Sequence, residues 1–109
     1  MARFKMLILS SPLDGRDDEF NTWYDNVHLP DVFRVPGVVG AERFRMRSGD
    51  RWQYLAIYEL DCDDSAAVEA ELMKRAGTAD MTMTEAFDMS TFYMGSAETI
   101  TPYRSADAA

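Results

Sequence analysis

The hydrophobic residues of the chain follow two spacings in turn, one typical of strands and one typical of helices. In the first stretch, Arg3 to Ser10, apolar residues fall on both sides of the chain, which predicts a strand that is covered on both faces. Phe20, Trp23, Tyr24 and Val27 then recur at i, i+3, i+4 and i+7, the stripe of a helix that lays one side on a core. The predicted fold therefore begins with a strand and an amphipathic helix.

Pro30 sets the predicted end of that helix. A proline disfavours the α region for the residue before it, so we expect regular helix to end near Leu29 and to leave His28 in the last turn. Pro30 can itself begin a short new turn, because a proline is tolerated at a first helical position.

Two alternating stretches joined by a hairpin turn follow. Val38 to Arg47 predicts a second strand, in which Arg43 lies on the face opposite Phe44. The turn lies at Ser48 to Asp50, and Arg51 to Leu60 predicts a third strand with one aromatic and one aliphatic face. The aromatic face of this strand carries Trp52, Tyr54 and Tyr58.

The last third of the chain predicts a helix and a closing strand. Ser65 to Arg75 has candidate N-caps in the acidic run before it and a glycine shortly after its end. Thr82 and Glu85 have the spacing of a capping box, which predicts a short extra helix through Asp88. Thr91 to Ser96 is the last predicted strand. The residues of the longer helix that we expect to face the core are Val68, Leu72 and Met73.

This order of elements is the split βαβ pattern of an α+β, ferredoxin-like domain with an antiparallel sheet. Helices cover only one face of such a sheet, and the other face would carry more large apolar residues than a monomer leaves in water. We therefore expect a homodimer in which the aromatic strand faces are buried between subunits. Residues 1–103 form the single predicted domain, and residues 104–109 form a disordered tail.

Composition and charge narrow the class of protein. A chain of 109 residues with 47% hydrophobic residues is long enough for one domain with a small core. Its net charge of -8 disfavours nucleic acid and anionic membranes as partners. The apolar run from Met6 to Leu9 is too short for a membrane span. Cys62 is the only cysteine, which excludes an internal disulfide and a cysteine-based metal cluster. We expect a cytoplasmic protein without a bound metal.

His28, the only histidine, is the first candidate for chemistry. Its ordinary pKa lies near neutrality, which suits a general acid or base, although the residue could equally be a helix-end histidine stabilised by the macrodipole. Tyr24 lies one turn earlier on the same side, so its hydroxyl could contact the imidazole or a substrate oxygen. Asp25 could orient His28, although a solvated helix carboxylate is the commoner case. We expect His28 to be the catalytic residue, with Tyr24 and Asp25 as its partners.

Further side chains are candidates for contact with a small hydrophobic or aromatic ligand. Trp23 could line a pocket or pack in the core. Arg43 is the arginine of its strand that we expect to point inward, where it could clamp a carboxylate or an enolate oxygen. Four methionines late in the chain could form a pliable pocket wall or fill the core; they are Met81, Met83, Met89 and Met94. The predicted ligand-binding set is Trp23, Arg43, Tyr54, Tyr58 and Met83.

The segment Trp23-x4-His28, followed by Pro36 and Gly37, resembles the EthD-like branch of the dimeric α/β-barrel superfamily, a branch named for a protein of ethyl tert-butyl ether degradation. The resemblance implies that two ferredoxin-like subunits pair sheet to sheet and that each encloses a small-molecule pocket between its sheet and its helices. The superfamily includes polyketide cyclases, lactone isomerases, cofactor-free monooxygenases and haem enzymes, so the resemblance selects no single reaction. Haem-binding relatives are expected to ligate iron from a histidine on a later helix, where this chain has none, and we therefore expect no cofactor.

Three functions are compatible with these observations. We favour an enzyme that binds an aromatic or polyketide-like ligand and carries out cofactor-free proton transfer of the cyclase, isomerase or lyase type, with His28 as acid/base. The second is a cofactor-independent monooxygenase that oxidises an electron-rich phenol, which Trp23 and Trp52 leave open. The third is a ligand-binding or accessory protein without turnover, because no second strong acid or base lies near His28 in the sequence.

Overall fold

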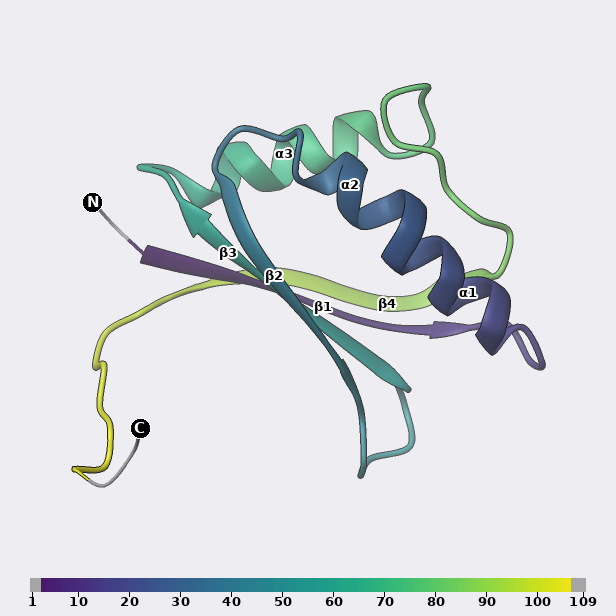
Figure 1. Cartoon of the computed structure of the whole chain (residues 1–109), viewed down its shortest axis with the longest axis horizontal. Coiled ribbons are helices and arrows are strands. Elements are labelled where there is room, and N and C mark those ends of the chain that lie inside the picture. Colours follow the sequence, from purple (N-terminus) through teal and green to yellow (C-terminus); the bar gives the residue numbers. More distant parts are fainter. Residues whose placement is uncertain (1–2, 107–109) are drawn as a thin grey trace.

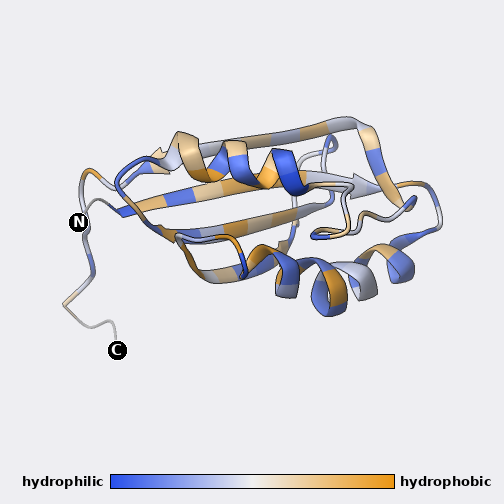
Figure 2. Ribbon diagram, turned by 90° about the horizontal axis from the view of Figure 1, so that it is seen from above, coloured by the Kyte–Doolittle hydropathy of each residue, from blue (hydrophilic) through white to orange (hydrophobic). Residues whose placement is uncertain are grey.

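The computed structural model of the protein describes residues 3–106. The elements of this part run in the order β1 (Arg3–Pro12), α1 (Asp17–Trp23), η1 (Tyr24–His28), α2 (Leu29–Val32), β2 (Val38–Arg45), β3 (Tyr54–Asp61), α3 (Ser65–Arg75) and β4 (Phe87–Glu98). The strands form one antiparallel sheet of four in the order β2-β3-β1-β4. All helical segments lie on the same face of this sheet (Figures 1 and 2). This arrangement confirms the predicted α+β, ferredoxin-like fold.

The prediction that regular helix ends near Leu29 was wrong, whereas the short turn predicted to begin at Pro30 is present within α2. The helical path continues through Pro30 to Val32, and its middle part, η1, is a π-helix in which the Leu29 N–H bonds to the carbonyl of Tyr24, five residues back. In an α-helix the ring of Pro30 would meet the carbonyl four residues before it. The wider π turn shifts the hydrogen-bond pattern by one residue just before the proline, which lets the helix pass that point.

The extra helix predicted from Thr82 to Asp88 is absent, and β4 begins at Phe87 instead. The Thr84 hydroxyl accepts a hydrogen bond from the N–H of Ala86 at 3.1 Å and holds a turn rather than a helix start. Ala86 and Phe87 are both buried, so packing against the core overrides the local capping signal. For the same reason β4 starts earlier than the predicted strand at Thr91.

The helix α3 lies where it was predicted, from Ser65 to Arg75. The Asp64 side chain caps it by accepting a hydrogen bond from the N–H of Ala66 at 3.0 Å. Val68 and Leu72 are buried as expected, whereas Met73 is 54% exposed and lies at the edge of the core. No helix among residues 3–106 is long and apolar enough to cross a membrane.

The hairpin between β2 and β3 is longer than predicted. β2 ends at Arg45 and β3 begins at Tyr54, so Trp52 lies in the connecting loop and not on the strand. At the other end of the chain, residues 104–106 are exposed and outside regular structure, while the rest of the predicted tail lies outside the described residues.

The aromatic face of β3 packs against the helices, which corrects the prediction that it lies between subunits. Tyr54 and Tyr58 are buried, and the ring of Tyr54 stacks on Phe20 of α1 with centroids 5.5 Å apart. The aromatic helix stripe and the aromatic strand face therefore cover each other. The uncovered face of the sheet carries the charged residues Lys5, Glu42 and Glu59 next to an apolar area, and the large apolar residues of that area are Leu7, Leu9, Phe44, Leu55, Ile57 and Tyr93.

Candidate functional site

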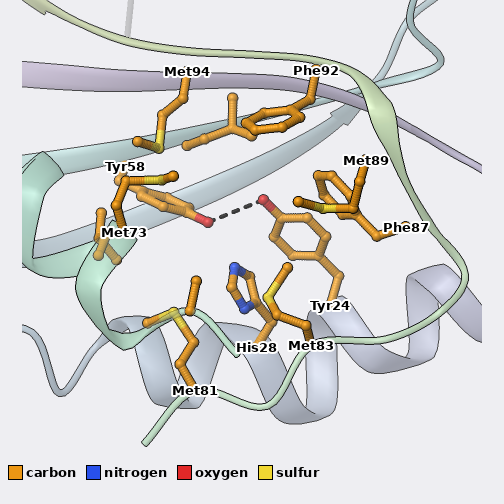
Figure 3. A pocket seen from close by; sticks show the side chains of 13 residues that line it. Tyr24, His28, Tyr58, Met73, Met81, Met83, Phe87, Met89, Phe92 and Met94 are labelled. Atoms are coloured by element: carbon orange, nitrogen blue, oxygen red, sulfur yellow. Dashed lines mark hydrogen bonds between the residues drawn. The ribbon is translucent and has the colours of Figure 1, made fainter. Parts of the chain in front are cut away.

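A cavity of about 90 Å³ lies between the sheet, the π-helical segment η1 and the chain that leads from α3 into β4 (Figure 3). Its wall is apolar except for two phenol hydroxyls and one imidazole, and no charged side chain of residues 3–106 lines it. The lining residues are Ile8, Tyr24, His28, Tyr58, Leu72, Met73, Ala76, Met81, Met83, Phe87, Met89, Phe92 and Met94. An enclosure of this kind suits a small apolar ligand with one polar group.

The two phenols form a buried pair. The hydroxyl oxygens of Tyr24 on η1 and Tyr58 on β3 lie 3.0 Å apart, and each side chain is 2% exposed. Burial raises the pKa of Tyr24 and raises that of Tyr58 well above its ordinary value, so both phenols are neutral at pH 7. One hydroxyl donates to the other, which leaves one O–H of the pair for a ligand oxygen.

His28 lies beside this pair, with its ring edge-on to Tyr24 at a centroid distance of 5.0 Å. Figure 3 shows one of its ring nitrogens turned toward the two hydroxyls. Burial lowers the pKa of His28 to about 4; the carboxylate of Asp31 opposes this effect, and the Arg43 guanidinium adds to it. The imidazole is therefore neutral at pH 7. Its Nδ1 is enclosed and has no hydrogen-bond partner among the described residues.

The π-helical segment positions the imidazole against Trp23. Their rings stack with centroids 4.4 Å apart, although the two residues are five positions apart in sequence. In an α-helix, positions five apart point about 140° away from each other. The wider turn of η1 brings them over one another. The indole N–H donates to the carbonyl of Thr82 at 2.9 Å, which holds Trp23 behind His28 and outside the cavity.

Asp25 does not orient His28. Its carboxylate accepts a hydrogen bond from Nη1 of Arg43 at 2.8 Å, and Nη2 of Arg43 donates to Asn21 at 2.6 Å. The guanidinium also lies 4.3 Å from the centroid of the Tyr24 ring. Arg43 points inward as predicted, but it lies behind Tyr24 and does not line the cavity. The hydroxyl of Tyr54 likewise lies outside, where it donates to Asp17 at 2.9 Å.

The structure thus divides the predicted site residues into two groups. Tyr24, His28, Tyr58 and Met83 line the cavity, while the other four predicted residues do not. The residues outside the cavity wall are Trp23, Asp25, Arg43 and Tyr54. All four methionines that were candidates for a pocket wall line the cavity.

Sequence reasoning missed the two phenylalanines of the cavity wall. Phe92 could have been found, because it alternates with Met94 on one face of the last predicted strand. Phe87 could not, because it was assigned to the helix that the structure lacks. Within residues 3–106, no group of three or more His, Cys, Asp or Glu side chains is placed to hold a metal ion.

The similarity to known proteins concerns the ferredoxin-like fold alone. No family profile matches the chain, and no curated protein is similar to it. A crystal structure of an ethyl tert-butyl ether degradation (EthD) family protein from Bacillus halodurans superimposes with a TM-score of 0.54 and 17% identity, over 92% of this chain and 100% of the other. A protein from Shewanella loihica described as "a putative monooxygenase" superimposes with a TM-score of 0.65 and 10% identity, over 94% and 99%. The resemblance to EthD-like proteins is therefore confirmed at the level of the fold.

Proposed function

We propose that the protein is an enzyme that binds a small aromatic, phenolic or polyketide-like ligand in this cavity and transfers a proton by cofactor-free acid/base chemistry. The observation that supports this proposal is the meeting of a neutral imidazole and two neutral phenols in an otherwise apolar enclosure. Such a site can accept a proton with one group and stabilise the resulting oxyanion with another.

The cavity wall indicates the class of ligand. Because no charged side chain lines the cavity, a carboxylate or phosphate bound there would be an uncompensated charge. The phenylalanine rings and thioethers instead suit an aromatic ring. A volume of about 90 Å³ accommodates at most one small ring, since a cavity of roughly 150 Å³ is known to bind benzene. Met73 and Met89 are more than half exposed at the rim, and their flexible side chains can move to admit a larger ligand.

The proposed step begins with a carbon acid next to a carbonyl group, or with a phenol. The imidazole nitrogen that faces the hydroxyls takes the proton, the bonding electrons move onto the ligand oxygen, and the free O–H of the Tyr24 and Tyr58 pair donates to that oxygen. The imidazolium of His28 then returns the proton to another ligand atom, so no cofactor is consumed. An isolated imidazolium is unfavourable here, but it forms beside the new anion, whose charge stabilises it.

Two alternatives rest on specific observations. The likeness to a described monooxygenase favours the same initial deprotonation of a phenol followed by consumption of O₂. The lack of a hydrogen-bond partner for Nδ1 of His28 among the described residues favours a binding protein, because no hydrogen bond at that nitrogen fixes the tautomer of the ring. Oxygen uptake separates the first alternative from our proposal, and absence of turnover with a bound ligand separates the second.

We also propose a homodimer formed through the uncovered sheet face. That face carries aliphatic side chains such as Leu9 and Ile57 on neighbouring strands, whereas the opposite face is already covered by helices. An apolar sheet face is stabilised when a second layer packs on it. A second copy of the same chain supplies such a layer with two-fold symmetry.

A ligand screen followed by an exchange assay tests the proposed function. Thermal shift with phenols, naphthols and aromatic 1,3-diketones, each paired with a carboxylated analogue, should show stabilisation by the neutral member of a pair only. Bound diketones should then exchange their acidic C–H for deuterium in D₂O faster than the free diketones do, and His28→Asn should lower this enzyme-dependent rate roughly 10² to 10⁴-fold. Val27→Asn is the matched control, because Val27 precedes His28 on η1 and is 40% exposed, which corrects the prediction that it faces the core. Binding without exchange or oxygen uptake would establish the binding-protein alternative.

A further inference from the structure

Arg43 occupies an unusual place for a charged residue. It lies on β2, on the sheet face that carries the helices, and its side chain is only 15% exposed. It does not reach the cavity, since the ring of Tyr24 separates the guanidinium from it. A role in direct ligand contact therefore does not fit its position.

Among the aromatic rings near Arg43, that of Tyr24 is the nearest, at 4.3 Å from the guanidinium, whereas Phe20 and Tyr54 lie 5.9 and 5.7 Å away. The two hydrogen bonds of Arg43 end on Asn21 and Asp25, which lie one turn apart on the helix and flank Tyr24 in sequence. Between these two anchors the planar guanidinium lies over the Tyr24 ring at 4.3 Å, a distance typical of a cation–π contact. The planar guanidinium of Arg43, held by two hydrogen bonds, keeps its position better than the flexible ammonium group of a lysine would.

Arg45 provides a contrast on the same strand face. It is exposed, lies 5.8 Å from the ring of Tyr54, and makes no hydrogen bond or ion pair among residues 3–106. The anchored geometry is therefore specific to Arg43 and is not a general property of arginines on this face.

We propose that Arg43 is a positioning residue, which clamps the ring of Tyr24 from outside the cavity and thereby holds the Tyr24 hydroxyl on Tyr58 and the Tyr24 ring edge on His28. Its catalytic importance rests on the proposed function, but its positioning action can be measured without ligand or turnover. When the clamp is lost, the Tyr24 ring moves and water reaches the imidazole, so the desolvation that lowers the pKa of His28 is reduced. The positive charge of Arg43 acts on the imidazole in the same direction.

The test uses the single histidine of the chain as a reporter. Its imidazole Cε1–H signal is titrated by NMR in the full-length, ligand-free protein, for the wild type and for Arg43→Met, Arg43→Lys and the control Arg45→Met. We expect both Arg43 variants to move the His28 midpoint upward from about 4 toward 6.5, and Arg45→Met to leave it unchanged. An unchanged midpoint in Arg43→Lys would show that only the charge matters and would overturn the proposal.

A double-mutant cycle separates positioning from general stabilisation. In a Tyr24→Leu background, Arg43→Lys, which keeps the positive charge, should cause no further change of the His28 midpoint, because the clamped ring is gone. Equal shifts in both backgrounds, or a lower melting temperature without any shift, would show a merely structural role. If Arg43→Met does not fold, Asn21→Ala removes one anchor while the charge remains, and it should give a smaller upward shift. No shift in Asn21→Ala would then count against the clamp.

Discussion

The indole of Trp23 and the imidazole of His28 stack at a centroid distance of 4.4 Å, with an angle of 23° between their planes. This contact joins two positions that an ordinary α-helix would point in different directions, and it exists because η1 is a π-helix. The placement of the only histidine therefore depends on the backbone irregularity that precedes Pro30.

Pro30→Ala tests this dependence. Alanine restores a backbone N–H and removes the ring clash, so the segment can relax toward an α-helix and His28 rotates away from Trp23. We expect the protein to stay folded, the NMR midpoint of His28 to move toward 6.5, and turnover to fall. A variant with an unchanged midpoint would show that the π-helix does not depend on the proline.

The buried imidazole predicts a specific pH dependence of stability. The pKa of His28 is about 4 in the folded protein and 6.5 in its ordinary state, so the unfolded chain binds more protons between these values. The free energy of unfolding of the wild type should therefore rise with pH from about 4 to 6.5. Protonation of His28 in the unfolded chain therefore destabilises the folded wild type at low pH, by about 3 kcal/mol at pH 4 and below. His28→Asn lacks this loss of stability. Urea unfolding at a series of pH values, with wild type and variant compared at each, measures the difference. Parallel curves would contradict the burial of His28.

Substitution of the proposed catalytic residues should lower turnover while the protein stays folded. His28→Asn should lower kcat roughly 10² to 10⁴-fold, the usual contribution of a positioned acid or base, and should change the free energy of unfolding at pH 7 by no more than about 1 kcal/mol. Tyr24→Phe and Tyr58→Phe should each have a smaller effect, because one hydroxyl of the pair remains. Normal turnover in His28→Asn would assign the histidine a structural role.

The pH profile of the wild-type enzyme gives an independent test of the base. Because a base must be deprotonated to act, kcat/KM should be constant near neutrality and should decrease as the pH falls through about 4. An ordinary exposed histidine would give a midpoint near 6.5 instead. Such a midpoint, found for the wild type, would mean that the active imidazole is solvated.

The proposed dimer can be tested on the uncovered sheet face. Light scattering should give twice the chain mass of 12.4 kDa for the wild type. Ile57→Glu places a charge in the centre of that face and should produce a monomer, whereas Ala70→Glu on the exposed side of α3 should remain a dimer. A wild-type monomer at micromolar concentration would exclude the dimer.

Much of the fold was predictable because its signals are local. The limits of α3 follow from a cap at Asp64 and a glycine shortly after the last turn, which act within a few residues of the helix ends. The alternation along the second strand was sufficient to place Arg43 on the face opposite Phe44, and the structure confirms the separate expectation that the Arg43 face is the inner one. The spacing of Tyr24 and His28 was sufficient to bring their rings together.

The sequence by itself therefore determined most of the elements, the order of the four strands and the two main helical regions, and the inward direction of several site residues. The tertiary structure decided which groups meet. Tyr24 bonds to Tyr58, 34 positions away, because strand pairing places that phenol opposite the helix. Asp25 bonds to Arg43 instead of His28 because the strand supplies a nearby guanidinium. Capping and periodicity act within one or two turns, whereas these partners depend on how helix and sheet pack, which no local pattern encodes.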